Sequence, residues 1–450
     1  MEHPIPVLGA GLAGSEAAWQ IAEAGFAVKL FEMRPHVRTP AHRTPLCAEL
    51  VCSNSLGSNL PDRGGGLLQM ELEALNCRLL AVARESAVPA GSALAVDRDI
   101  FAEKVTRALE AHPLIEIVRE EAPRVPDNPV VVVATGPLTS QALAADLQSL
   151  AGREHLAFFD AIAPVVTVES LNTAIVFRAS RREEGVGDYW NAPLDRNQYK
   201  NFIGALLEAS THAPKEFETD HPEAPRFFER CLPIEVLAAR GLESLRFGPM
   251  RPVGLTDPRT GKLPWAVLQM RQENLSGTLA NLVGFQTHVR HGDQEALLRM
   301  IPGMEDAEFA RLGSIHRNTF LDSPRLLEPT LEWRERPGLF MAGQITGMEG
   351  YLGNIGSGLL AARGALARLA GGEPEPLPRT TLLGALALHV ARSPSGSFQP
   401  MKAHFGLLPP LAGKMPKSER RKKLGERSMD ALASHRQNPP LPRPCTAPAE

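Results

Sequence analysis

A glycine motif close to the N-terminus constrains the fold of this chain more than any other feature of its sequence. The apolar segment IPVL (5–8) reads as a buried strand, and GAGLAG (9–14) follows it directly. The next residues, SEAAWQIAEAG (15–25), place alanines and an isoleucine on one face of a helix and end in glycine. FAVKLFE (26–32) reads as a second strand. The pattern predicts a βαβ unit at the start of an α/β fold.

The spacing of the glycines indicates what this unit binds. Gly9 permits the tight turn, Gly11 lets the backbone approach a pyrophosphate, and Gly14 lets helix and strand pack closely. Glu32 ends the second strand, where an acid can accept a hydrogen bond from a ribose 2′-hydroxyl. We therefore expect a nucleotide site, rather than a glycine turn without a ligand, made by Gly9, Ala10, Gly11, Leu12, Ala13, Gly14 and Glu32.

Two later strands favour FAD over NAD as the resident nucleotide. PVVVVATG (129–136) is a β-branched run ending at Gly136, and LFMAGQ (339–344) is a late strand ending at Gly343 and Gln344. Strands that lie in early, middle and late parts of the chain, as here, resemble the arrangement in FAD-binding Rossmann proteins. GVGD (185–188) lacks the third glycine and the helix of a second fingerprint. A nicotinamide cofactor, NADH or NADPH, would therefore visit without a Rossmann domain of its own.

Length and composition predict an ordinary globular protein of two or three domains. The chain has 450 residues, of which 43% are hydrophobic and 22% charged. A formal net charge of −3 gives no sign of nucleic-acid binding by the whole surface, so such binding would need local patches. We expect no signal peptide, no membrane segment and no metal site. Five scattered cysteines fit a reducing cytosol, which predicts a cytoplasmic protein.

The middle of the chain differs from its two ends. Helical patterns near 65–84 and 99–111 follow the βαβ unit, whereas VVTVES, TAIVFRAS and WAVLQMR read as antiparallel strands. We predict an FAD-binding Rossmann-type domain split in sequence, with a smaller mixed α/β insertion domain. The predicted boundaries are 1–165 and 326–430 for the two FAD-binding parts, 166–325 for the insertion and 431–450 for a disordered tail.

Two of the five cysteines have unusual surroundings. Cys52 lies among Ser, Asn and Gly in AELVCSNSLGS, and Cys231 precedes a helical pattern whose N-terminus would favour a thiolate. For each of them, a reactive thiol and a small buried hydrophobe are equally good interpretations. Cys47 and Cys77 lie in apolar patterns that predict packing, and Cys445 lies in the tail.

Basic residues offer candidate contacts for an anionic ligand. Arg246, Arg251, Arg271 and Arg290 interrupt apolar stretches, where they suit either phosphate and carboxylate recognition or surface salt bridges. The segment KMPKSERRKKLGER (414–427) has seven Lys or Arg against two Glu. It is either a solvated helical face or a contact for a phosphate backbone.

Taken together, a series of long motifs resembles the folate- and FAD-dependent tRNA (uracil-5-)-methyltransferases from residue 5 to about residue 430. The motifs are GAGLAGSEAAWQIAEAG, FEMRP, TPAH, AELVCSNSLGS, ALAVDRDIF, CLPIEVLAARG, FGPMRPVGL, GFQTH, HRNTF, AGQITGMEGY and FQPM followed by FGLLPPL. Motifs this long and in this order are far more specific than a single fingerprint. The related flavin-dependent enzymes that install carboxymethylaminomethyl groups on tRNA uridines are the alternative. A flavin oxidoreductase acting on a small substrate is a further one.

The resemblance implies methylation of C5 of uridine 54 in the T-loop of tRNA. The carbon would come from 5,10-methylenetetrahydrofolate, with FAD reduced by NAD(P)H. It assigns Cys52 as the nucleophile and Cys231 as the acid/base partner, or the two roles exchanged. His288, Arg290 and Tyr351 are the candidate substrate residues.

The chain departs from the family pattern in a few places. Gln344 stands where many flavoproteins have Asp, and the run LGNIG (352–356) stands where the pattern is acidic and alanine-rich. Lys402 and His404 replace expected asparagines. Extra glycines in the 352–356 run would cost helix stability, about 1 kcal/mol each in a helix interior.

Overall fold

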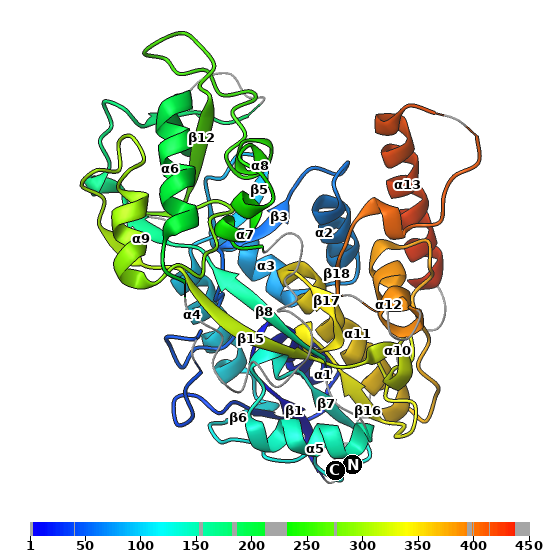
Figure 1. Cartoon of the computed structure of the whole chain (residues 1–450). Helices are drawn as coiled ribbons and strands as arrows, with labels where there is room; N and C mark the ends of the chain where they lie inside the picture. Colours follow the sequence, from blue (N-terminus) through cyan, green and yellow to red (C-terminus); the bar gives the residue numbers. More distant parts are fainter. Residues whose placement is uncertain are drawn as a thin grey trace.

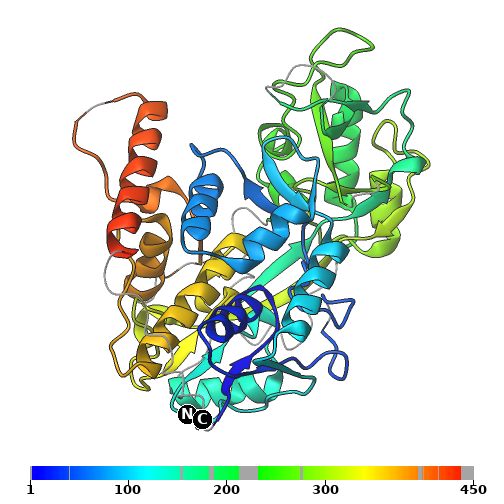
Figure 2. The same cartoon turned by 180° about the vertical axis from the view of Figure 1, so that it is seen from behind.

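The computed structural model describes most of the chain. The described residues are 3–39, 41–152, 156–181, 187–211, 232–273, 277–393, 398, 400–413 and 415–436. Figures 1 and 2 show two sheet-containing parts, with the parallel sheet at one end and the antiparallel sheet at the other.

A five-stranded parallel sheet forms the nucleotide-binding part, in the order β16-β7-β1-β2-β6. Its strands are β1 (Ile5–Leu8), β2 (Val28–Phe31), β6 (Ile115–Val118), β7 (Val131–Val133) and β16 (Leu339–Met341). Helix α1 (Leu12–Glu23) connects β1 to β2, which confirms the predicted βαβ unit. Strands from residues 5, 131 and 339 are neighbours, so early, middle and late segments of the chain share one sheet.

Helices cover both faces of this sheet. Val132 points into the core shared with α1, α3 (Arg78–Glu85), α4 (Arg98–Ala111) and α11 (Tyr351–Leu369). Val131 and Val133 point into a second core with α5 (Gln141–Ala151). This two-sided burial explains why the strand sequence is continuously apolar. The predicted helical stretch 65–84 is two helices, α2 (Gly64–Ala74) and α3, because Asn76 turns the chain with φ 59°.

The insertion contains a six-stranded antiparallel sheet, in the order β10-β11-β12-β13-β9-β14. Its strands are β9 (Val165–Thr167), β10 (Phe177–Arg178), β11 (Tyr189–Leu194), β12 (Ala266–Gln272), β13 (Leu279–Leu282) and β14 (Phe309–Arg311). Helices α6 (Arg196–Glu208), α7 (Ile234–Ala239), α8 (Ser244–Phe247) and α9 (His291–Leu298) accompany them. The paired strands β8 (Leu156–Ile162) and β15 (Ser314–Phe320) run between the two parts (Figure 1).

Smaller elements complete the structure. A three-stranded sheet joins β3 (Ser55–Ser58), β5 (Ala93–Val96) and β4 (Ala87–Val88), and β17 (Met348–Glu349) pairs with β18 (Met401–Lys402). Of the strand expected in TAIVFRAS (173–180), only Phe177–Arg178 forms, as β10, because residues 172–175 make a turn.

The basic C-terminal segment is a helix, and it is longer than expected. Helix α13 (Lys417–Arg436) extends six residues into the segment predicted to be a disordered tail, so that prediction is wrong for 431–436. The physical reason is packing: α13 lies against α2, and Leu432 is only 1% exposed. Within the described part of the chain, no helix is both long and apolar enough to span a bilayer.

Candidate functional site

The glycine turn after β1 leaves an open cradle at the N-terminus of α1. Gly9 has φ +94°, and a Cβ there would lie 2.7 Å from the Ala134 carbonyl oxygen. A Cβ on Gly14 would lie 1.8 Å from the Gly9 oxygen, so only glycine permits this helix–strand contact. Around a Cβ on Gly11, by contrast, no heavy atom lies within 4 Å. The space next to Gly11 therefore holds no protein atoms, and a ligand can approach the backbone there.

The first turn of α1 presents its backbone to this space. Gly11 is the N-cap residue and has no side chain to occupy the helix end, and Leu12 and Ala13 begin the helix. The N–H groups of a first helical turn lack partners within the helix, and the helix dipole favours an anion there. These residues therefore fit the pyrophosphate of FAD.

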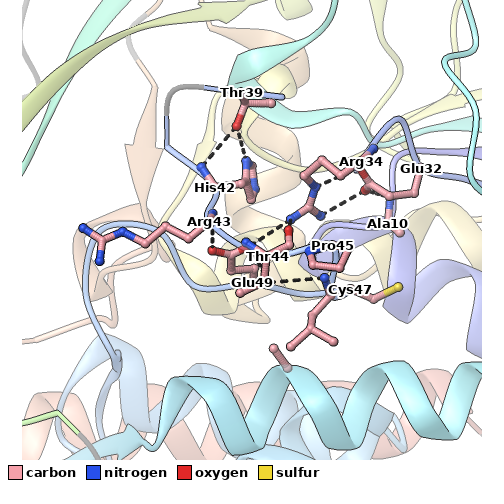
Figure 3. A network of polar contacts seen from close by, with 12 residues as sticks. Ala10, Glu32, Arg34, Thr39, His42, Arg43, Thr44, Pro45, Cys47 and Glu49 are labelled. Atoms are coloured by element: carbon pink, nitrogen blue, oxygen red, sulfur yellow. Dashed lines mark hydrogen bonds and ion pairs between the residues drawn. The ribbon is translucent and has the colours of Figure 1, made fainter. Parts of the chain in front are cut away.

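Glu32 lies beside this turn in a network that Figure 3 shows. Its carboxylate accepts hydrogen bonds from Ala10 N at 3.2 Å and from Arg34 Nε at 2.8 Å, and Arg34 Nη1 also contacts Glu49 at 2.9 Å. Burial opposes ionisation of Glu32, but the hydrogen bonds and charge of Arg34 outweigh it and lower the pKa of this carboxyl. Glu32 is thus held ionised as an acceptor. Arg34, in the FEMRP motif, was not among the predicted site residues.

An open pocket lies between Glu32 and the segment after β7. About 570 Å³ of empty space, part of it open to solvent, is lined by Gly9, Gly11, Glu32, Thr135 and Ser140 among others. Its position beyond the glycine turn suits the adenosine half of a dinucleotide. Gly136 is the neighbour of Thr135 in the 3-10 turn Gly136–Leu138 and has φ +69°, but it does not line the pocket itself.

The late strand brings Gly343 to the same cradle. Gly343 has φ +85°, and a Cβ on it would lie 3.3 Å from the Ala13 side chain. Its N–H donates to Ser357 Oγ at 2.6 Å. Gln344 begins a 3-10 turn and is half-buried. Predicted cofactor residues more than 300 positions apart in the chain are therefore neighbours.

Cys52 lies on the loop before β3, in contact with the start of α11. The Tyr351 hydroxyl oxygen accepts hydrogen bonds from Cys52 N at 2.9 Å and from Ser53 N at 3.1 Å. The same hydroxyl lies 3.1 Å from Cys52 Sγ. Because its oxygen accepts two bonds, its proton is available to donate to sulfur. Burial, followed by the charge of Cys52, raises the pKa of Tyr351 well above its ordinary value, so the phenol stays protonated.

The polar residues that follow Cys52 attach this loop to the insertion sheet. Arg271, on β12, donates to Asn54 Oδ1 at 3.0 Å and to Ser53 Oγ at 3.1 Å. Asn54 Nδ2 donates in turn to the carbonyl of Gln272 at 2.8 Å. Of the four arginines suggested from sequence, Arg271 is the one that these contacts bring to the Cys52 loop. The sequence signal was an arginine within an apolar strand pattern.

The other predicted substrate residues have their described contacts within the insertion. His288 N donates to Glu235 Oε1 at 2.6 Å, and the His288 Nδ1 atom lies 3.7 Å from the same oxygen. Arg290 is exposed, is the N-cap residue of α9 and donates its N–H to the Ser210 carbonyl. Cys231 lies outside the described residues; Pro233, two positions later, is the N-cap of α7.

Cys47 and Cys77 are buried, as their apolar patterns predicted. Cys47 is 0% exposed, and burial raises its pKa to about 11. Burial also raises the pKa of Cys77 well above its ordinary value. Both thiols are therefore neutral at physiological pH. Among the described cysteines, Cys52 alone is half-buried rather than fully enclosed. Cys445 lies outside the described residues.

Comparison with known proteins identifies relatives over nearly the whole chain. The family described as Glucose inhibited division protein A matches residues 4–373. A methylenetetrahydrofolate–tRNA-(uracil-5-)-methyltransferase of Thermosynechococcus vestitus is 54% identical over 91% of this chain and 89% of its own. The enzyme of the same name from Symbiobacterium thermophilum is 51% identical over 96% of this chain and 97% of its own.

Solved structures agree with the fold. GidA of Aquifex aeolicus, in its form II crystal, superposes with a TM-score of 0.68 at 16% identity, over 96% of this chain and 73% of that one. At this identity the likeness concerns the fold, and it confirms the predicted Rossmann-type architecture. The sequence matches go further: the chain belongs to the glucose inhibited division protein A family and to the methylenetetrahydrofolate–tRNA-(uracil-5-)-methyltransferases.

Proposed function

We propose that this protein methylates C5 of uridine 54 in the T-loop of tRNA. The carbon donor is 5,10-methylenetetrahydrofolate, and FAD is reduced by NADH or NADPH. The observation that carries the proposal is the match, at 51% identity over 96% of the chain, to a relative whose name states methylenetetrahydrofolate-dependent methylation of uracil C5 in tRNA. The open glycine cradle supports FAD as the cofactor. Because the substrate is tRNA, we also propose that the protein acts in the cytoplasm.

The chemistry of uracil explains why a thiol is needed. C5 of uracil is a poor nucleophile, but addition of a thiolate to C6 turns C5 into an enolate carbon that can attack an activated methylene. A base then removes the C5 proton while the bond from the methylene carbon to its carrier nitrogen breaks, and after a hydride has reached that carbon the thiolate leaves C6 and the C5–C6 double bond re-forms. FAD, when bound, supplies the hydride that completes the methyl group.

We propose Cys52 as the nucleophile and Cys231 as the acid/base partner, or the two with their roles exchanged. A hydrogen bond from the Tyr351 hydroxyl to Cys52 Sγ would stabilise the thiolate before attack. The loop around Cys52 is polar and half-buried, which suits a thiol that must meet a base taken out of its stack.

The residues proposed to hold FAD lie in three segments. The glycine turn and the start of α1 would bind the pyrophosphate, Glu32 the ribose, and the segments after β7 and β16 the remaining atoms. The set is Gly9, Ala10, Gly11, Leu12, Ala13, Gly14, Glu32, Gly136, Gly343 and Gln344. His288, Arg290 and Tyr351 are proposed for the substrate side, where the Tyr351 hydroxyl lies 3.1 Å from Cys52 Sγ.

The deciding experiment supplies the purified FAD-loaded protein with unmodified tRNA transcript, methylenetetrahydrofolate and NADPH. The expected product is 5-methyluridine at position 54, detected by nucleoside mass spectrometry. The variant Cys52→Ala should retain FAD and give no product. A protein that holds FAD but forms no 5-methyluridine would sink the proposed function, whereas product from Cys52→Ala would remove only the assigned role.

A further inference from the structure

Arg271 reaches the loop that carries Cys52 because of its position in β12. Side chains alternate across this strand, so Met270 points into the core of the insertion and Arg271 points to the opposite face. On that face Arg271 lies directly across from Tyr189 of β11 and Asn281 of β13. Residues paired in this way share one side of an antiparallel sheet. The insertion sheet therefore has a row of three polar side chains on this face, of which Arg271 contacts the Cys52 loop.

The loop is held from both parts of the molecule. From α11, the Tyr351 hydroxyl accepts hydrogen bonds from the N–H groups of Cys52 and Ser53. From the insertion, Arg271 donates to the side-chain oxygens of Ser53 and Asn54. The residues that these groups hold lie within two positions of the thiol in the chain. A phenol and a cation are thus fixed close to the sulfur.

Arg271 is a buried cation whose described hydrogen bonds go to neutral oxygens. It is only 7% exposed, and burial is the main cause that lowers its pKa. Of the ion pairs that the described residues form, none includes Arg271; the neighbouring carboxylate of Glu273 is paired with Arg98. A buried guanidinium is costly unless an opposite charge lies near it. A thiolate at Cys52 would supply that charge.

The other ionisable groups near Arg271 do not remove the need for a counter-charge. Tyr189 is a phenol, which is ordinarily neutral at physiological pH. The charge of Glu273 raises the pKa of Arg271 and that of Arg98 lowers it, so the two act in opposite directions. The charge of Cys52 also raises the pKa of Arg271. Because this attraction is mutual, the same interaction favours the thiolate form of Cys52.

Two further groups face the loop from other elements, and neither is an anion. Arg311 of β14 donates to the carbonyl of Val51 at 3.3 Å, one residue before Cys52. The Tyr351 hydroxyl lies 3.1 Å from the sulfur, and burial keeps it protonated by raising its pKa. Both groups therefore act on a thiolate in the same direction as Arg271 does.

We propose that Arg271 is a positioning residue for the methylation reaction, which holds the Cys52 loop against the insertion sheet and balances the negative charge of the Cys52 thiolate. This role rests on the function proposed above, because that function gives the thiolate its use. It holds whether Cys52 adds to C6 or takes the proton from C5, since both roles need ionised sulfur. Tyr351 would supply a hydrogen bond to the sulfur and Arg271 the opposite charge.

The test follows the rate of Cys52 alkylation by iodoacetamide against pH in FAD-loaded protein, without turnover. Arg271→Gln should move the midpoint of this profile to higher pH, because loss of a neighbouring cation disfavours the thiolate. The expected shift is about one unit, the low end of the range of about 1–3 units for a close opposite charge, since Cys52 is only half-buried. Well below the midpoint, alkylation should then be roughly tenfold slower. Arg271→Lys keeps the charge and should retain most of the wild-type midpoint.

Two controls separate the charge of Arg271 from general damage. Ser53→Ala removes one hydrogen bond of the loop and keeps the guanidinium, so its midpoint should change little. Arg107→Gln removes a 79% exposed arginine on α4 and should give the wild-type profile. Retained FAD and an unlabelled Cys47 at pH 8 show that a variant is folded, because the Cys47 thiol is enclosed.

An unchanged midpoint in Arg271→Gln, or an equal shift in Ser53→Ala, would overturn the proposal. Should Arg271→Gln fail to hold FAD, wild type decides alone: its midpoint should lie below about 8.5, the ordinary value for a cysteine thiol, and a higher one would overturn the proposal. In the methylation assay, the rate of Arg271→Gln should recover as the pH rises, which a purely structural loss would not do. Absence of 5-methyluridine from wild type, with the alkylation shift present, would contradict the proposed function alone.

Discussion

Cysteines at different positions of this chain have surroundings that favour opposite reactivities of the thiol. The Cys47 thiol is enclosed and its N–H donates to Thr106, whereas Cys52 shares a polar loop with Ser53 and Asn54. A thiolate is the reactive form of cysteine, and burial without a charged partner suppresses it. Reactivity at the residue scale is therefore set by the surroundings of each thiol, which for Cys52 include the distant Tyr351 as well as its polar sequence neighbours.

Alkylation of the native protein should separate these cysteines. With iodoacetamide at pH 8, Cys52 should be labelled, while Cys47 and Cys77 should stay unmodified. The pKa of Cys47, about 11, lies three units above this pH, so only about one thiol in a thousand is ionised. Its labelling should rise as the pH increases toward 11. Peptide mass spectrometry gives the result, and labelling of Cys47 at pH 8 as fast as of Cys52 would contradict it. Urea-unfolded protein is the control, in which both should react.

Removal of the Tyr351 hydroxyl should make Cys52 less reactive. In Tyr351→Phe the sulfur loses a hydrogen-bond donor at 3.1 Å. A net contribution of about 1 kcal/mol corresponds to a roughly fivefold slower alkylation of Cys52 at neutral pH. The rate of loss of the unmodified Cys52 peptide measures this. An unchanged rate would mean that the hydroxyl positions the loop without acting on the thiol.

At the scale of elements, the glycines of α11 have a packing role that the sequence did not indicate. Gly353 and Gly356, in the 352–356 run that departs from the family pattern, suggested a weaker helix, whereas Gly358 and Gly364 lie outside that run. In the structure α11 lies directly on α1, and a Cβ on Gly358 would lie 2.1 Å from the Ala13 carbonyl oxygen. Gly364 similarly meets the Phe340 ring. The glycines lower the intrinsic stability of α11, but they let this helix approach the glycine turn closely.

Two alanine substitutions in α11 test this explanation. Gly358→Ala should lower the free energy of unfolding by about 1–3 kcal/mol, because its Cβ would meet backbone atoms of α1. Gly353→Ala is the matched control, since the nearest atom to its Cβ is a leucine side chain at 3.6 Å. It should be neutral or stabilise the protein by up to about 1 kcal/mol. Urea denaturation measures both, and equal effects at the two positions would refute the packing role.

On the scale of the whole molecule, α13 has one face that packs against the protein and another that is exposed and charged. Leu424, Ser428 and Leu432 are buried at intervals of four residues, and Ser428 donates to the buried Glu71 of α2. Arg420 and Lys422 are exposed. In both views α13 and the insertion sheet project from the same end of the molecule, with α2 between them (Figures 1 and 2). Deleting the segment would therefore disturb packing as well as charge.

Neutralising only the exposed charges gives a cleaner test of RNA contact. The double variant Arg420→Gln, Lys422→Gln should weaken tRNA binding and reduce the slope of log K against log salt by about one to two units, since each lost phosphate contact contributes about 0.7–0.9. The matched control is Lys104→Gln, Arg107→Gln on α4, which should leave the slope unchanged. Filter binding at several salt concentrations measures it. An unchanged slope in the α13 variant would show that this face is merely solvated.

The sequence by itself determined the local elements and the chemistry that the chain can use. The β1–α1–β2 unit and β12 followed from apolar periodicity, because strands and helices record their burial in a period of two or about 3.6. The glycine spacing predicted the cradle, because a backbone turn without Cβ atoms depends on residues adjacent in sequence. Long motifs likewise identified the family.

Only the tertiary structure decided which distant groups meet. Neither periodicity nor composition places Tyr351 on Cys52 or Arg271 on Asn54. Those contacts join segments that are far apart in the chain, so they depend on tertiary packing. The same packing explains why α13 continues to Arg436: its stability comes from burial against α2, which no local pattern records.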